Sequence, residues 1–153
     1  IKLIDIFKNI HNKNIIHRDV KPENICFHNN HIKIIDFGLS KIIDNKKTTI
    51  NSIIGTPNYV SLRILNHCEP TWLDELESLC YIFIYLTLDD KLLDKYFSET
   101  NLSKKKPETI NKYIQDLELQ QIITKHISIC RETTVENIDI YTLLKDLYKN
   151  KHL

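Results

Sequence analysis

The first residues of the chain place apolar side chains at helical spacing. Leu3, Ile4, Phe7 and Ile10 recur at intervals of three or four residues, and charged or amide residues lie at most of the other positions. An apolar stripe of this period is typical of an α-helix packed on a core. The pattern predicts a helix over residues 1–14.

Two short runs rich in β-branched and aromatic residues follow this helix. Residues 25–27 and 32–35 flank the polar stretch 28–31, in which two asparagines are adjacent. Asparagine tolerates the left-handed backbone of tight turns. The runs therefore predict a β-hairpin, and the polar residues 17–24 before it are expected to form a loop.

The most apolar helix is expected at about residues 72–88. After Ser78 this segment leaves no fully polar face on a helical wheel, and a helix that is apolar all round is a buried one. Amphipathic patterns at residues 110–129 and 138–148 predict at least two further helices. The sequence thus indicates a mainly α fold with a buried central helix.

Two stretches lack a persistent period. Residues 36–70 contain the polar segment 44–52, rich in Lys and Thr, which predicts a long surface loop of the kind that often carries function. Residues 89–107 are charged and contain three consecutive lysines at 104–106. We interpret this second stretch as a loop with a solvated charge cluster.

Composition and charge narrow the class of protein. With 153 residues, of which 42% are hydrophobic and 27% charged, the chain is long enough for one domain with its own core. A net charge of +1 provides no overall field that would recruit nucleic acid or an anionic membrane, so we expect neither as a partner. No apolar run approaches the roughly 18–20 residues that a membrane-spanning helix needs.

The cysteines and the N-terminus indicate where the protein resides. The sequence has four cysteines but no CxxC pair and no signal-peptide pattern, so neither disulfides nor a cysteine-bound zinc is expected. We expect an intracellular, cytoplasmic location, which would be the host cytoplasm for a viral protein; a nuclear location stays open. Because the chain begins with Ile1, we expect it to start within a longer protein.

The chemistry-bearing residues lie in two polar motifs. Residues 17–24 read HRDVKPEN and residues 35–38 read IDFG. The two glycines of the chain, Gly38 and Gly55, indicate positions where the backbone needs a positive φ or a close approach. In order and spacing the two motifs resemble the catalytic loop and the metal-binding triplet of protein kinases. The resemblance implies transfer of the γ-phosphate of ATP with the help of Mg²⁺.

The resemblance assigns a role to four residues. It implies that Asp19 orients or deprotonates the acceptor hydroxyl and that Lys21 neutralises the transferred phosphate. It also implies that Asn24 and Asp36 bind Mg²⁺, and that these two residues and Lys21 bind ATP. Without the motifs around them, the two aspartates would be read as surface carboxylates that cap local turns.

Four further residues are implied to support this site. His17 is expected to pack in the core beneath the loop, and Arg18 to contact the activation segment or its phosphate. Gly38 ends the metal-binding triplet. Thr56, in the Gly-Thr pair at 55–56, is implied to hydrogen-bond the catalytic Asp and Lys, while the simpler interpretation is a turn hydroxyl.

Several segments narrow the resemblance to one family. A lysine at 21 followed by Pro-Glu, and the Gly-Thr pair, are typical of serine/threonine kinases. Residues 55–63 read GTPNYVSLR and residues 74–81 read DELESLCY. Both resemble segments of the casein kinase 1 family, which contains the vaccinia-related kinases, and the resemblance covers nearly the whole chain.

This resemblance implies the fold and the domain organisation. We expect residues 1–153 to be part of a protein kinase domain, its C-terminal lobe, an α+β and mainly α fold with a helical bundle around a buried central helix and small β-hairpins. The catalytic loop would span 17–24 and the activation segment 36–63. Nothing in the chain resembles the glycine-rich loop, the β3 lysine or the helix C glutamate of the N-terminal lobe, so we expect that lobe to be absent from it. The isolated chain is therefore expected to bind ATP weakly and to be inactive.

Some positions depart from the kinase pattern. Glu75 stands where kinases have an Asp that anchors the catalytic loop, and Cys80 replaces a glycine; both substitutions are expected to loosen the scaffold. Arg63 occupies the place of a glutamate that pairs with a late arginine. Arg131 is therefore expected to cap its helix or to pair with Glu132.

Three functions follow from these observations. The leading one is a serine/threonine kinase that acts on a protein hydroxyl, and the alternative is a pseudokinase or truncated kinase-like scaffold that binds partners without catalysis. A small-molecule kinase with a related loop is the third, and Lys21 and Thr56 argue against it. In the activation segment, Thr48, Thr49 and Ser52 are either phosphorylation sites or polar loop residues. The oligomeric state is not indicated.

Overall fold

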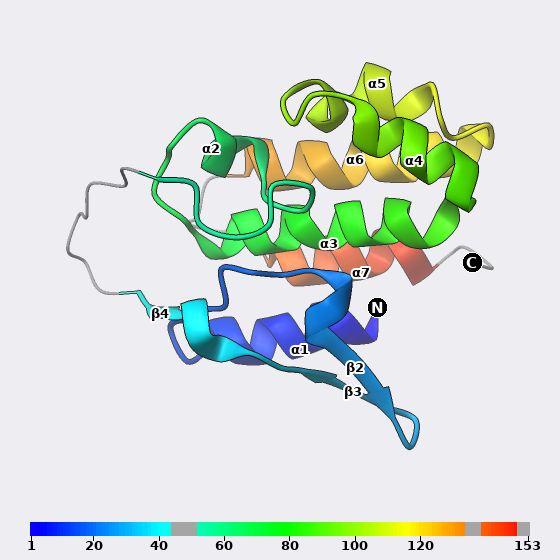
Figure 1. Ribbon diagram of the computed structural model, residues 1–153. Helices are drawn as coiled ribbons and strands as arrows, with labels where there is room; N and C mark the ends of the chain where they lie inside the picture. Colours follow the sequence, from blue (N-terminus) through cyan, green and yellow to red (C-terminus); the bar gives the residue numbers. More distant parts are fainter. Residues whose placement is uncertain (44–51, 134–138, 150–153) are drawn as a thin grey trace.

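The computed structural model describes residues 1–43, 52–133 and 139–149, and helices predominate in it (Figure 1). The α-helices are α1 (Lys2–His11), α2 (Leu62–Leu65), α3 (Trp72–Thr87), α4 (Asp90–Ser98), α5 (Pro107–Asn111), α6 (Leu117–Glu132) and α7 (Ile140–Lys149). Short 3₁₀ helices are η1 (Pro22–Asn24), η2 (Phe37–Leu39) and η3 (Ser103–Lys105). The strands are β1 (Ile15–Ile16), β2 (Ile25–His28), β3 (His31–Ile34) and β4 (Lys41–Ile42).

The four strands form two small antiparallel pairs, β1 with β4 and β2 with β3. The turn of the β2–β3 hairpin contains Asn29 and Asn30, whose φ angles are 49° and 61°. These left-handed angles are the ones that asparagine tolerates, so the predicted hairpin is present. It brings Ile35 back to the end of the 17–24 loop, where the Ile35 N–H donates to the Asn24 carbonyl at 3.0 Å.

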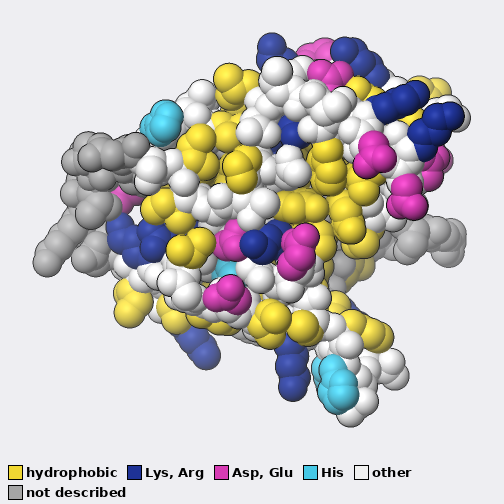
Figure 2. Space-filling model, viewed as in Figure 1, with side chains coloured by type: hydrophobic (Ala, Val, Ile, Leu, Met, Phe, Trp, Pro, Cys, Tyr) yellow, Lys and Arg dark blue, Asp and Glu magenta, His cyan; other side chains and the backbone are white. Residues whose placement is uncertain are grey.

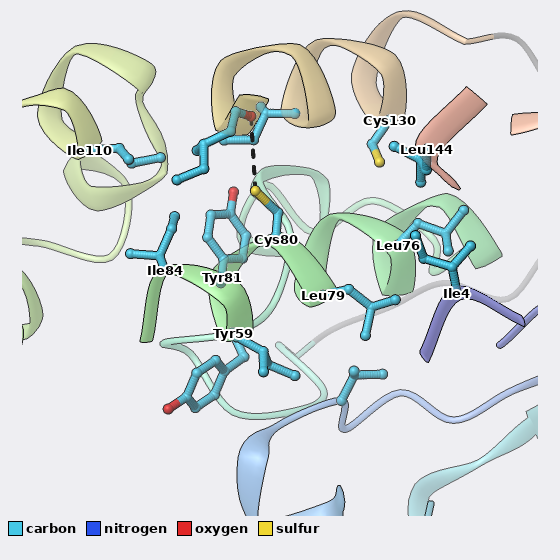
Figure 3. Packing of buried hydrophobic residues seen from close by; sticks show 14 of the residues in the cluster. Ile4, Tyr59, Leu76, Leu79, Cys80, Tyr81, Ile84, Ile110, Cys130 and Leu144 are labelled. Atoms are coloured by element: carbon cyan, nitrogen blue, oxygen red, sulfur yellow. Dashed lines mark hydrogen bonds between the residues drawn. The ribbon is translucent and has the colours of Figure 1, made fainter. Parts of the chain in front are cut away.

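Helix α3 is the centre of the molecule. Helices α1 and α6 pack on it, and α7 lies against both of them (Figures 1 and 3). Leu76 and Cys80 on α3 are fully buried. At its N-terminus the Asp74 side chain accepts from the Thr71 backbone N–H at 2.7 Å, which satisfies an amide that has no partner inside the helix. The helix predicted at about 72–88 therefore forms the scaffold that carries the other elements.

The charged stretch 89–107 is not the loop that its charges suggested, because α4 occupies its first half. Leu92, Tyr96 and Phe97 have helical spacing, and Tyr96 is buried. The Asp89 side chain caps the helix by accepting from the Leu92 N–H at 2.8 Å. The charged residues of α4 lie on its exposed side, and the prediction was wrong because it weighed them above the apolar spacing.

The lysine cluster at 104–106 also differs from the prediction. Lys104 and Lys105 are only 1% and 0% exposed, and Lys106 alone is exposed. Both buried ammonium groups donate hydrogen bonds to Asn58, which removes them from solvent. The stretch is therefore not a solvated charge cluster.

The amphipathic pattern at 110–129 belongs to two helices, α5 and α6. Helix α6 begins after Asp116, whose side chain accepts from the Leu119 N–H at 2.8 Å. Helix α7 accounts for the pattern at 138–148, of which Ile138 lies outside the described residues. The periodicity predicted helices here, but not the break between them.

Two observations concern the expected class of protein. Within the described residues, no helix has both the length and the apolar character that crossing a membrane requires. All four cysteines are free thiols, and Cys80 and Cys130 are buried.

Most of the polar segment 44–52, with Thr48 and Thr49, lies outside the described residues, whereas Ser52 is exposed.

Candidate active site

The loop over residues 17–24 is held in place by contacts from two sides. The Arg18 backbone has a φ of 69°, and its N–H donates to Glu75 Oε1 at 2.6 Å. On the other side lies Gly55, with a φ of 102°; a Cβ there would come within 2.5 Å of the Arg18 carbonyl oxygen. The Arg18 side chain donates to the carbonyl of Leu39. Such a left-handed backbone persists because its surroundings fix it.

Glu75 connects the loop to α1 and α7. Its Oε2 lies 2.7 Å from His11 Nε2, and His11 Nδ1 lies 2.7 Å from the Tyr141 hydroxyl oxygen. Glu75 therefore does not loosen the anchor, because one carboxylate oxygen reaches the Arg18 amide while the other binds His11. Cys80 fits the core with its thiol 3.9 Å from the Ile123 carbonyl.

The sequence did not predict the series of side-chain contacts that runs from Glu75 through His11 to Tyr141. The available signal was His11 itself, a polar residue on the apolar face of a predicted helix. A buried imidazole at such a position needs hydrogen-bond partners. Their identity depends on α3 and α7, which are distant in the sequence.

Four side chains of the predicted site converge. Lys21 Nζ lies 2.8 Å from Asp19 Oδ2 and donates to Thr56 Oγ1 at 3.3 Å. The Thr56 hydroxyl donates to Asp19 Oδ1 at 2.7 Å, and Asn24 Nδ2 donates to Asp19 Oδ2 at 3.2 Å. Figure 2 shows acidic and basic side chains gathered near the middle of the molecular face that lies above the β2–β3 hairpin.

These contacts keep Asp19 ionised. Burial alone would raise the pKa of Asp19, but hydrogen bonds from Lys21, Thr56 and Asn24 outweigh it and lower the pKa. The pKa of Lys21 is raised, chiefly by the hydrogen bond to Asp19, with smaller contributions from the charges of Asp19, Glu23 and Asp36. The pair is therefore a carboxylate and an ammonium at neutral pH.

Asp36 lies two residues beyond the β3 strand, close enough for its charge to contribute to the raised pKa of Lys21. Its backbone is left-handed, with a φ of 61°, and its Oδ1 accepts from the Gly38 N–H at 3.2 Å. A Cβ on Gly38 would lie 3.0 Å from the same oxygen, so glycine leaves room for the carboxylate. Beneath it, His17 is fully buried, with Nε2 2.9 Å from the Ile35 carbonyl and its ring centroid 4.8 Å from that of Phe37.

The donor chemistry of Asn24 and Asp36 fits Mg²⁺. The Asn24 amide nitrogen binds Asp19, so its Oδ1 is the atom that can act as a ligand, and Asp36 is exposed. Mg²⁺ prefers hard oxygen ligands and keeps several waters, so one or two carboxylates together with substrate phosphates suffice. The described ranges contain no group of three or more His, Cys, Asp or Glu residues that could hold a metal ion.

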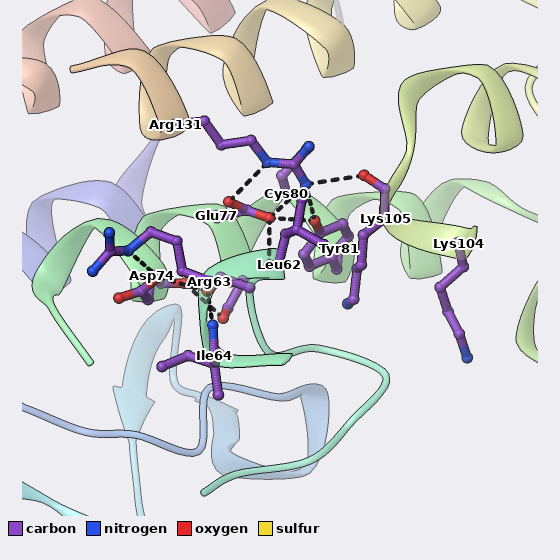
Figure 4. Close-up of polar contacts among 12 residues, drawn as sticks. Leu62, Arg63, Ile64, Asp74, Glu77, Cys80, Tyr81, Lys104, Lys105 and Arg131 are labelled. Atoms are coloured by element: carbon purple, nitrogen blue, oxygen red, sulfur yellow. Dashed lines mark hydrogen bonds and ion pairs between the residues drawn. The ribbon is translucent and has the colours of Figure 1, made fainter. Parts of the chain in front are cut away.

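Arg131 forms a buried ion pair with Glu77 (Figure 4). Arg131 Nε donates to Oε2 at 3.2 Å and Nη2 to Oε1 at 2.8 Å. The Leu62 N–H and the Tyr81 hydroxyl donate to the same carboxylate. Burial alone would raise the pKa of Glu77, but the hydrogen bonds from Arg131 and its charge outweigh it and lower the pKa. The expected cap or pairing with Glu132 was wrong, because a carboxylate from α3 lies within reach.

Comparisons with known proteins find similarity to protein kinases. The sequence matches the model of the protein kinase domain over residues 2–151. It is 31% identical to a probable casein kinase I homolog of Encephalitozoon cuniculi (strain GB-M1), over 99% of this chain and 43% of that protein. It is 38% identical over 86 residues to 3-phosphoinositide-dependent protein kinase 1 of Rattus norvegicus, which covers 54% of this chain and 15% of that protein. The chain thus spans less than half the length of either relative.

Proposed function

Since this chain belongs to the protein kinase family, we propose that the protein is a serine/threonine kinase that transfers the γ-phosphate of ATP to a Ser or Thr hydroxyl of a protein substrate. The observation that carries the proposal is the convergence of Asp19, Lys21 and Thr56 within hydrogen-bonding distance. Thr56, within the predicted activation segment 36–63, contacts both members of the catalytic pair, Asp19 and Lys21. An intracellular, cytoplasmic location belongs to the same proposal.

In this proposal Asp19 accepts the proton of the attacking hydroxyl. A general base must be ionised and within hydrogen-bond reach of that proton, and the lowered pKa of Asp19 meets the first condition. Each carboxylate oxygen has two lone pairs. Among the described contacts, Oδ1 accepts from Thr56 alone, which leaves one lone pair for the substrate. The hydroxyl oxygen then bonds to the γ-phosphorus as the bond to the β-phosphate oxygen breaks, and ADP leaves.

Electrostatic stabilisation of the transferred phosphoryl group is the role of Lys21, Asn24 and Asp36. The Lys21 ammonium neutralises charge on the phosphoryl group, which is the larger part of catalysis in phosphoryl transfer. Asn24 and Asp36 would hold Mg²⁺, which neutralises and orients the phosphate oxygens when it is bound. His17 and Arg18 keep the loop in place through their contacts with Ile35 and Leu39.

The test is phosphate transfer by the full-length protein, measured for wild type and Asp19→Asn with casein, a basic protein and small alcohols as acceptors. We expect transfer to protein Ser or Thr and a loss of about 100-fold or more in kcat for Asp19→Asn, since general bases contribute about 10²–10⁴-fold. Asp90→Asn, an exposed position on α4, is the matched control.

Each other outcome contradicts the proposal in a distinct way. An active Asp19→Asn variant would contradict the role of the carboxylate. A folded wild-type protein that transfers no phosphate to any acceptor would identify a pseudokinase scaffold, and transfer to small alcohols alone would identify a small-molecule kinase.

A further inference from the structure

Two buried lysines hold a residue of the segment that leaves the candidate active site. Lys105 Nζ donates to the Asn58 carbonyl oxygen at 2.5 Å, and Lys104 Nζ donates to Asn58 Oδ1 at 2.7 Å. Figure 4 shows both side chains extending in the same direction from the η3 segment, with Lys105 beside Tyr81. One asparagine is therefore bound through its backbone and its side chain at once.

Burial of these ammonium groups is costly. Removing a charge from water is strongly unfavourable unless it is paired, and among the described residues no carboxylate lies within ion-pair distance of Lys104 or Lys105. Burial lowers the pKa of Lys105 well below its usual value. The partners of Lys105 are Asn58 and the ring of Tyr81, whose centroid is 3.4 Å from Nζ. What the two buried lysines provide in return is their hydrogen bonds to the backbone and the side chain of Asn58.

The bound asparagine belongs to the turn that presents Thr56. The N–H groups of Tyr59 and Val60 both donate to the Thr56 carbonyl, at 2.9 and 3.1 Å. Asn58 is the middle of this turn, so fixing it limits the movement of Thr56. The hydroxyl at the start of the turn donates to Asp19. A continuous set of contacts therefore leads from η3 to the catalytic carboxylate.

We propose that Lys104 and Lys105 are positioning residues for phosphoryl transfer, which hold Asn58 and thereby keep the Thr56 hydroxyl against Asp19. The catalytic meaning of this role rests on the proposed kinase function. The geometric part does not, because the hydrogen bond from Thr56 to Asp19 exists whether or not the protein transfers phosphate.

The first test follows the protonation of Asp19 by carboxyl ¹³C NMR in the full-length protein. Because the Thr56 hydrogen bond lowers the pKa of Asp19, Lys105→Met should raise that pKa, as should Thr56→Val. The control is Lys106→Met, which removes the same charge from the exposed neighbour and should leave the titration unchanged.

The double variant Lys105→Met/Thr56→Val separates positioning from a direct effect of charge. If Lys105 acts through the turn, the double variant should titrate like Thr56→Val alone. If it acts through space, its loss should shift the titration further even without the threonine hydroxyl, and that additive result would overturn the proposal. An unchanged titration in folded Lys105→Met would overturn it as well.

A second variant and a second measurement cover the case in which Lys105→Met does not fold. Lys104→Met keeps the bond to the Asn58 backbone and should raise the pKa of Asp19 by less than Thr56→Val; no rise would contradict the proposal. In the kinase assay, folded lysine variants should lose about 10-fold to 100-fold in kcat, the effect of a small misplacement near the reacting group, with little change in KM for ATP. A protein without kinase activity that still shows the NMR shifts would contradict the proposed function and not the positioning.

Discussion

At the scale of single residues, the Thr56 hydroxyl contacts both charged groups of the candidate site, Asp19 and Lys21. It accepts from Lys21 and donates to Asp19, so Thr56→Val removes both contacts while keeping the shape of the side chain. The pKa of Asp19 should then rise, because one of the hydrogen bonds that stabilise the carboxylate is lost. Asp19 must be ionised to accept a proton, so the acid limb of the kcat/KM profile should move to higher pH.

The measurement is the pH dependence of kcat/KM for Thr56→Val beside wild type, with Thr124→Val on α6 as the matched control. We expect about a tenfold loss at neutral pH, equivalent to about 1.4 kcal/mol of transition-state stabilisation. A profile that falls uniformly without moving its acid limb would contradict the link between Thr56 and Asp19.

Gly55 gives a second prediction at this scale, which concerns stability. Its φ of 102° is left-handed, and a Cβ would lie 2.5 Å from the Arg18 carbonyl oxygen. Gly55→Ala should therefore lower the free energy of unfolding by about 1–3 kcal/mol or more. Gly38→Ala is the comparison, since its Cβ would lie 3.0 Å from a side-chain oxygen of Asp36, which can shift. Urea denaturation that finds equal losses would contradict this ranking.

At the scale of the elements, the ion pair between Arg131 and Glu77 links α6 to α3. The Glu77 side chain is 2% exposed and that of Arg131 22%. Arg131→Met would leave the carboxylate buried and uncompensated, which typically costs about 3–5 kcal/mol. The double variant Arg131→Met/Glu77→Gln should recover part of this loss because it removes the buried charge. A double variant no more stable than the single one in chemical denaturation would show that charge is not the cause.

The elements also show what local pattern can predict. The first helix, the β2–β3 hairpin and α3 each have a spacing or a turn residue that identifies them within a short window. Helix α4 had such a signal in Leu92, Tyr96 and Phe97, but its exposed charges obscured it. The burial of Lys104 had no local signal, because its acceptor on Asn58 is 46 residues away.

In the candidate site, too, contacts between residues close in the sequence could be predicted, whereas contacts between distant elements could not. Asp19, Lys21 and Asn24 lie within a few residues of one another, so their meeting follows from the motif, and the hairpin places Asp36 beside them. The supports of the loop could not be predicted in this way. Glu75 and His11 come from separate helices, and only tertiary packing gives each the other as a partner.

At the scale of the whole molecule, His126 is a buried group that joins three helices. It lies on α6, with Nε2 2.8 Å from the Leu76 carbonyl on α3 and Nδ1 2.7 Å from the Tyr148 hydroxyl on α7. A carbonyl can only accept, so Nε2 carries a hydrogen. Burial lowers the pKa of His126 to about 4, so the imidazole is neutral at neutral pH and its Nδ1 accepts from the Tyr148 hydroxyl.

This neutral histidine should make the fold sensitive to acid. An unfolded histidine has a pKa of about 6.5, so between about pH 6.5 and 4 the unfolded state binds more protons than the folded one. The contribution of His126 is complete above that range and is lost as the pH falls through it, up to about 3 kcal/mol. The free energy of unfolding, measured at a series of pH values, should therefore decline more steeply for wild type than for His126→Gln, which cannot titrate. His28→Gln on the exposed hairpin should follow wild type, and a His126→Gln curve parallel to wild type would show that another group causes the acid sensitivity.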